Sequence, residues 1–200
     1  SFSPVKNLTG FVQFQDSRTF GEETSTSANM KNIDLHQAFF KIENLFDLPV
    51  DLKLGRFEAY YGSERFIGTV NWNNVGRSFD GGIISYKHDK INVDLLVARE
   101  FERFLVGDST DQNIYGLFVD LNLVNSYKIR PFIIMQRIQP TNVLSRTTIG
   151  LNIKGELDQF NHEIDFGYQT GTITSGGREQ DISAYTFSFS ADYNFRSELK

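Results

Sequence analysis

The sequence contains no cysteine and very little proline, with 0 Cys and 4 Pro among its 200 residues. Without cysteine there is no disulfide framework, no thiolate metal site and no cysteine nucleophile. No run of about 18 apolar residues occurs, so the sequence predicts no transmembrane helix. The formal net charge of −5 provides no general basic face, so we expect no nucleic-acid partner.

Catalytic and metal-binding motifs are also missing. The three histidines, His36, His88 and His162, stand apart from one another and lack the spacing of metal ligands. Neither a GxSxG nor a GxGxxG motif occurs. We therefore predict a protein that is not an enzyme, with no catalytic residues, no metal site and no cofactor.

Residues that favour strands are abundant, and they alternate with polar residues. Phe accounts for 19 residues and Tyr for 8, and aromatic side chains fit well on a pleated sheet. Successive side chains of a strand point to opposite faces. The region from residue 185 to residue 195 therefore predicts a strand with one polar face and one apolar face. The apolar face consists of Tyr185, Phe187, Phe189, Ala191, Tyr193 and Phe195.

The same period of two recurs along the chain and predicts about ten strands. We expect them near residues 8–20, 33–45, 50–61, 78–88, 91–97, 115–123, 128–136, 147–154, 163–169 and 185–195. A length of about ten residues is what a tilted membrane strand requires. The expected fold class is all-β: an antiparallel up-and-down transmembrane β-barrel, or a ten-stranded portion of a larger, truncated barrel.

The expected connections alternate between long and short. Residues 21–32, 62–77, 103–112 and 170–181 form long connections and 139–145 a medium one, whereas 44–49, 88–90, 124–126 and 156–159 form short ones. Outer-membrane barrels combine long extracellular loops with short periplasmic turns. We therefore expect one β-barrel domain over residues 1–200, in the bacterial outer membrane and in contact with lipid and lipopolysaccharide. Because residues 196–200 look like a turn toward another strand, we expect this domain to be an incomplete segment of a longer barrel.

Residues 54–86, which read LGRFEAYYGSERFIGTVNWNNVGRSFDGGIISY, resemble the alginate-export family of outer-membrane β-barrels. The matching elements are Gly55-Arg56, Tyr61-Gly62, Arg65, Ile67-Gly68, Trp72-x-Asn74-Val75-Gly76-Arg77 and Phe79-Asp80-Gly81. Residues 11–18 match the family more weakly. The resemblance implies a transport channel whose lumen is rich in Arg and Lys and passes an anionic polysaccharide. It also implies a barrel larger than this chain.

Charged residues gather in and around the longest expected loop. The candidates for contact with the pore or the substrate are Arg56, Glu58, Arg65, Arg77, Asp80, Lys53, Lys128 and Arg130. Arg pairs bidentately with carboxylates, including those of uronic acids, and rings of Arg or Lys favour anions in pores. The same charges also fit a second interpretation, in which Arg–carboxylate ladders brace the barrel wall.

The connection from Gly62 to Arg77 contains apolar residues that would be unusual in a freely solvated loop. Phe66, Ile67 and Trp72 are among them. We therefore expect this connection to fold into the lumen or across the barrel mouth. Arg56 and Arg77 should then lie near acidic residues of the wall, with Asp80 as the expected partner of one of them.

Three functions remain open at this point. We predict a porin-like outer-membrane channel for anionic polysaccharide or small polar solutes. The first alternative is a non-conducting barrel that acts as a scaffold or binds partner proteins of an envelope assembly. The second alternative is a soluble β-protein that binds carbohydrate.

Overall fold

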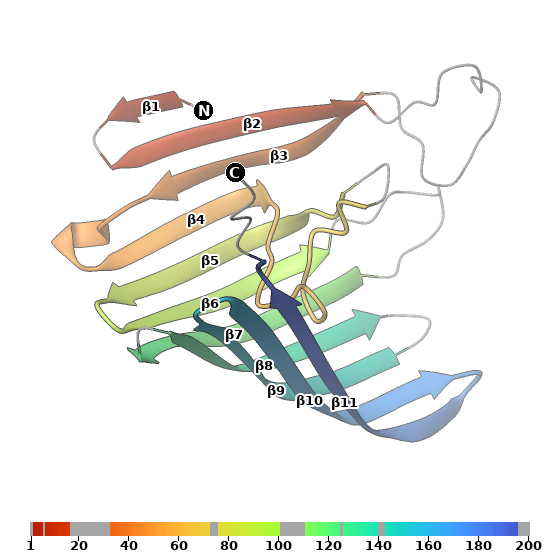
Figure 1. Ribbon diagram of the computed structural model, residues 1–200. Helices are drawn as coiled ribbons and strands as arrows, with labels where there is room; N and C mark the ends of the chain where they lie inside the picture. The colour runs from red at the N-terminus through yellow and green to blue at the C-terminus, as the bar shows by residue number, and fades with distance from the viewer. Residues whose placement is uncertain are drawn as a thin grey trace, which may run out of the picture.

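The computed structural model describes residues 2–5, 7–16, 33–72, 76–100, 111–124, 126–139 and 143–195. These residues form one antiparallel sheet of eleven strands, whose order in space follows the chain, as Figure 1 shows. The strands are β1 (Phe2–Val5), β2 (Leu8–Asp16), β3 (Ile33–Ile42), β4 (Val50–Phe57), β5 (Phe79–His88), β6 (Ile91–Glu100), β7 (Asp111–Val124), β8 (Tyr127–Gln139), β9 (Val143–Leu157), β10 (Phe160–Ser175) and β11 (Arg178–Tyr193). The expected loop over 21–32 and most of the one over 103–112 lie outside the described residues.

The prediction of an all-β, up-and-down fold is confirmed, with one strand more than expected. The additional strand is β1, whose four residues are too few to show an alternation of their own, and it pairs with β2. The one helical element in the described ranges is η1 (Leu45–Asp47), a 3-10 turn between β3 and β4. In the part of the chain that the structure describes, no helix is both long enough and apolar enough to cross a membrane.

The prediction of a long connection over residues 170–181 is wrong. Strand β10 continues to Ser175, which pairs with Arg178 at the start of β11. Only Gly176 and Gly177 lie between them, with φ angles of 57° and 76°. A two-residue turn of type I′ requires positive φ at both central positions, and glycine adopts it without a steric cost. The Thr and Ile residues of this region therefore extend the two strands.

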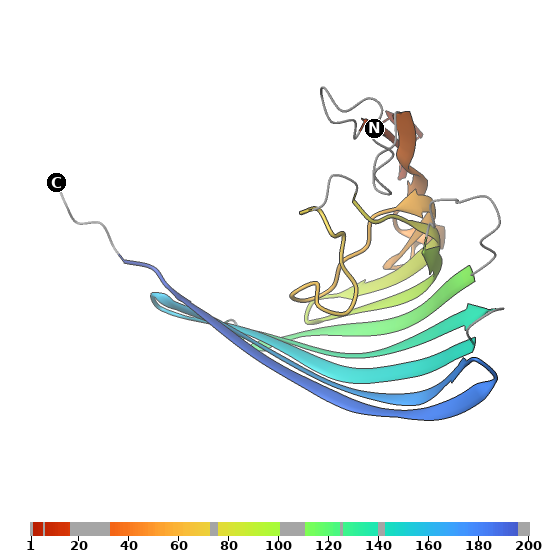
Figure 2. The same cartoon turned by 90° about the vertical axis from the view of Figure 1, so that its right-hand side faces the viewer.

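The sheet is strongly curved, and its two faces differ chemically. Figure 2 shows a trough, with the chain between β4 and β5 lying on its concave side. One row of residues crosses the convex face from β4 to β11 and is apolar throughout. In register, it consists of Leu52, Ile84, Leu95, Leu117, Ile133, Ile149, Tyr168 and Tyr185. A continuous apolar outer face is characteristic of a membrane barrel wall.

The buried core lies on the concave side. Its largest fully buried side chains are Phe57, Phe79 and Leu96, which belong to strands β4, β5 and β6. Ile67, from the connection between β4 and β5, is only 2% exposed and joins the same cluster. We call the described part of this connection, residues 58–72 and 76–78, the inner segment. Burial of its apolar side chains holds it against the sheet, so the expectation that it folds inward is confirmed.

Replacing Phe189 with Arg is expected to lower the free energy of unfolding in a bilayer by about 2–4 kcal/mol, the cost of a lipid-facing Arg near the midplane. Phe189 lies on the convex face, opposite Ile164 of β10. Ser190→Arg, at the next position and on the other face, is the matched control and should cost about 0.5 kcal/mol or less. Denaturant unfolding in lipid vesicles measures both changes, and equal costs would contradict a single lipid-facing side.

Candidate functional site

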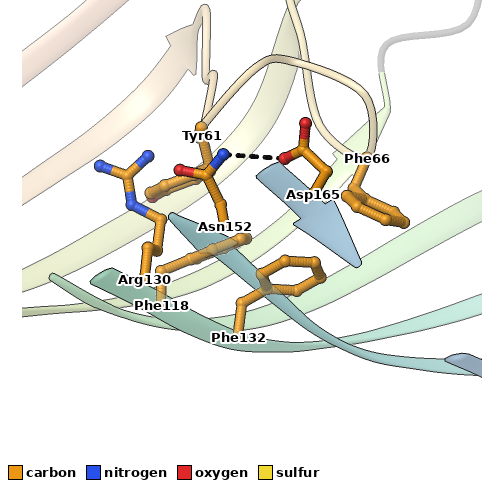
Figure 3. A pocket seen from close by; sticks show the side chains of 8 residues that line it. Tyr61, Phe66, Phe118, Arg130, Phe132, Asn152 and Asp165 are labelled. Atoms are coloured by element: carbon orange, nitrogen blue, oxygen red, sulfur yellow. Dashed lines mark hydrogen bonds between the residues drawn. The ribbon is translucent and has the colours of Figure 1, made fainter. Parts of the chain in front are cut away.

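The inner segment packs on a row of the concave face that crosses four strands. In register, this row consists of Phe118, Phe132, Gly150 and Gly167. The Tyr61 ring stacks on Phe118 with 3.5 Å between ring centroids and 2° between planes. The Phe66 ring lies against Phe132 with 4.9 Å between centroids. Two aromatic rings of the inner segment thus cover two aromatic rings of the sheet, as Figure 3 shows.

The two glycines of this row provide the space for the rings. A Cβ atom at Gly167 would lie 2.6 Å from the Phe66 ring. A Cβ atom at Gly150 would collide with the Phe132 ring. Contacts this close do not occur in packed proteins, so any larger residue would force an aromatic ring out of place. The glycine pair therefore forms a slot that determines where Phe66 sits.

A buried carboxylate fastens the inner segment to β10. Asp165, which is 3% exposed, accepts a 2.6 Å hydrogen bond from the Ser63 hydroxyl and a 3.2 Å one from Nε of Arg65. Its second oxygen accepts a 2.8 Å hydrogen bond from Nδ2 of Asn152, drawn in Figure 3. A buried carboxylate is tolerated only with such partners. The Asp165 cluster therefore fixes one side of the inner segment.

A second charged cluster lies under the Tyr61 ring. Arg130 binds Asp120 bidentately, and its Nη2 donates a 2.7 Å hydrogen bond, while Nζ of Lys128 lies 2.9 Å from the same carboxylate. The Arg130 guanidinium lies 6.0 Å from the Tyr61 ring centroid, within the range of a cation–π contact. Burial, together with the nearby Asp94 carboxylate, raises the pKa of the Tyr61 hydroxyl, so Tyr61 stays neutral.

Both ends of the inner segment are tied to strands. At its start, Oε1 of Glu58 lies 2.8 Å from Nε2 of the buried His36. At its end, Nε of Arg77 lies 2.8 Å from Oε1 of Glu100, whose other oxygen accepts a hydrogen bond from Gln112. The inner segment is therefore anchored at both ends as well as in its middle.

Lys53 lies on the concave face beside the inner segment. Its Nζ is 4.8 Å from the ring centroid of Phe39 and 5.3 Å from that of Phe57. Both distances fit cation–π contacts. The aromatic core therefore holds this lysine on the inner side of the wall.

Arg56 and Asp80 pair with each other as expected, but they do so on the convex face. The Arg56 guanidinium donates hydrogen bonds of 2.7 and 2.9 Å to the two Asp80 oxygens. Both residues are next to inward-facing phenylalanines, Phe57 and Phe79, and are in register with one another. Alternation therefore directs them to the side that carries Leu54. The structure brings the other candidates to the concave side and places these two residues apart from them.

The sequence selected Glu58, Arg65 and Arg77 of the inner segment as candidates, but not the residues that hold its middle against the sheet. Ser63, Asn152 and Asp165 were not candidates, although alternation places Asp165 on the polar face. The contact between Ser63 and Asp165 joins positions 102 residues apart. A local pattern carries no information about such a partner, so a polar residue facing inward was the only signal available.

The comparison with known families covers almost the whole chain. A family model described as alginate export matches residues 5–200. This range includes every strand from β2 to β11 as well as the inner segment. The sequence matches no individual curated protein.

Asp165→Ala is expected to loosen the inner segment, because it removes the acceptor for both Ser63 and Arg65. The loss should be about 1–3 kcal/mol, as for other buried hydrogen bonds that lose one partner. Hydrogen exchange of the Tyr61 and Glu64 amides, which are bonded within the inner segment, should accelerate.

The matched control is Glu163→Ala, on the same strand and the same face. Glu163 accepts a hydrogen bond from Asn152, but its replacement leaves the bonds from Ser63 and Arg65 in place. Equal acceleration of exchange in both variants would show that Asp165 has no particular role in holding the segment.

Proposed function

The chain belongs to the alginate-export family, and from this premise we propose that it supplies part of the wall of an outer-membrane channel that passes an anionic polysaccharide. The family is one of transport proteins rather than enzymes, and its fold is an outer-membrane β-barrel. The proposal goes further in three respects: a conducting pore, a preference for anions, and direct contact between the concave face and a uronic-acid polymer.

The observation that carries this proposal is a groove in which a cation and an aromatic ring lie together. Ser63, Glu64, Arg65, Phe66, Trp72 and Thr186 line it, between the inner segment and β11. Trp72 is 78% exposed, and the Arg65 side chain is half exposed. A sugar ring has an apolar face that packs on an aromatic ring, and a guanidinium binds a carboxylate in a fork. A uronic acid offers both groups.

The carboxylates that pair with Arg65 and Arg77 are less accessible than these two arginines. In the pair of Arg65 and Asp165, the side chains are 50% and 4% exposed. In the pair of Arg77 and Glu100, they are 37% and 20% exposed. The cation is the more accessible partner in each pair, so a passing chain meets guanidinium groups held in place by acids beneath them.

The packing of the inner segment also supports a second function, that of a non-conducting scaffold. Tyr61 and Phe66 are locked onto the sheet, and a segment held this firmly can obstruct a pore as well as narrow it. A soluble carbohydrate-binding protein is less well supported, because the apolar row on the convex face needs a covering. Ion conductance separates the channel from the scaffold.

In planar bilayers, the double variant Arg65→Ala/Arg77→Ala is expected to lower the ratio of anion to cation permeability by roughly threefold or more, because two accessible fixed charges leave the path. Arg56→Ala, on the convex face, is the matched control and should keep the wild-type ratio. Block of the ion current by an oligouronate should weaken in Arg65→Ala and in Trp72→Ala.

Each outcome decides between the functions. A folded, inserted protein that conducts no ions would support the scaffold. A conducting protein whose double variant keeps the wild-type selectivity would show that the arginines brace the wall. A neutral oligosaccharide of equal length that blocks the current as well as the oligouronate would contradict the anionic substrate.

A further inference from the structure

A charged row lies on the convex face, at the end of the sheet where the long β4–β5 and β6–β7 connections are. Its residues are in register on the consecutive strands β4 to β8: Arg56, Asp80, Arg99, Asn113 and Arg137. We call this set the arginine row. It contains three arginines and one aspartate. Arg99 is exposed and Arg137 is partly exposed.

The arginine row borders directly on the apolar surface. The next row toward the short turns contains Leu54, Val97, Tyr115 and Met135 in register across the same strands, all of them exposed. The row beyond it is the apolar row that contains Leu52. When this face lies in a bilayer, the arginine row is therefore on the side of the apolar surface where the strands run from hydrocarbon toward headgroups.

The opposite border of the apolar surface carries aromatic side chains in place of arginines. Toward the short turns, the convex face carries aromatic side chains, among them Tyr86, Phe160 and Tyr193. Aromatic rings suit the boundary of either leaflet, whereas a cluster of arginines suits a leaflet whose headgroups are anionic. The arginine row lies at the end with the long connections, which in outer-membrane barrels is the external end.

We propose that the arginine row binds the phosphate groups of a phosphorylated glycolipid, a lipopolysaccharide, in the external leaflet. This inference rests on the proposed function, because it requires the convex face to lie in an outer membrane. Arg remains charged and binds phosphate bidentately. The three arginines occupy every second strand and are therefore roughly 10 Å apart, so neighbouring ones can hold separate phosphates of one headgroup.

Asp80 orients one member of the row. It accepts hydrogen bonds from Nε and Nη2 of Arg56, and Nη1 of Arg56 donates to the carbonyl oxygen of Leu35. This guanidinium is therefore held in a fixed orientation at the edge of the apolar surface. Arg99 is exposed, and an arginine side chain is long enough to reach toward headgroups.

The test uses the full chain reconstituted in phosphatidylcholine nanodiscs and incubated with diphosphorylated lipid A or with its dephosphorylated form. Native mass spectrometry measures the lipid that remains bound. The wild type is expected to retain the diphosphorylated form on the order of tenfold better than Arg99→Ala/Arg137→Ala does. Arg146 of β9 lies on the concave face, where it donates to the Gln136 side chain. The concave-face variant Arg65→Ala/Arg146→Ala removes the same number of charges and should retain lipid like the wild type.

The outcomes separate this inference from the proposed function. Equal retention of the two lipid forms, or equal retention by the convex and concave double variants, would overturn the inference while leaving the barrel intact. Displacement of lipid A by the same concentration of inorganic phosphate would also overturn it, because the site would then be one for free anions. Failure of the wild type to enter neutral bilayers would refute the proposed function, and the inference with it. Arg99→Lys/Arg137→Lys should retain an intermediate amount of lipid.

Discussion

The contact of Tyr61 and Phe66 with the concave face is the interaction on which the candidate site depends. The ring pairs contribute about 0.5–1.5 kcal/mol each beyond the burial of their apolar area, and the absence of side chains at Gly150 and Gly167 leaves room for the Phe132 and Phe66 rings. Once these rings are seated, Ser63 and Arg65 come within reach of Asp165. Apolar packing therefore places the inner segment, and the buried carboxylate then orients its guanidinium. Arg65 faces the groove because the packed rings and the Asp165 carboxylate together fix its position.

Much of the fold follows from alternation, because an inward or outward direction repeats every second residue and needs no knowledge of distant partners. The apolar positions from Tyr185 to Phe195 and the turns near residues 89 and 158 were predicted in this way. The ends of strands were less predictable. Thr172 and Ile173 lie among glycines and serines that resemble a loop, and only the Gly176-Gly177 turn, which makes their pairing possible, shows that they belong to β10.

The residues of the site could be predicted in part, because their apolar or charged character is visible in the sequence. The sequence identified the inner segment by its apolar residues and Asp80 as the partner of either Arg56 or Arg77 by their charges. It did not show on which face that pair lies, because the decision rests on the inward direction of the adjacent Phe57 and Phe79. The arginines of this sequence therefore form two groups on opposite faces of the sheet. Arg65, Arg77 and Arg130 lie on the concave side, and the arginine row lies on the convex side.

The long-range bonds of the inner segment also have a kinetic consequence. Every strand pairs with its neighbour in sequence, so the sheet can grow hairpin by hairpin, with little loop-closure entropy at each step. Ser63 and Arg65, in contrast, bind the Asp165 carboxylate, which follows them by 102 and 100 residues in the sequence. Contacts of such high order form slowly. The bonds from Ser63 and Arg65 to Asp165 are therefore expected to form late in folding, and until β10 has joined the sheet, aromatic packing on β7 and β8 has to hold the middle of the inner segment.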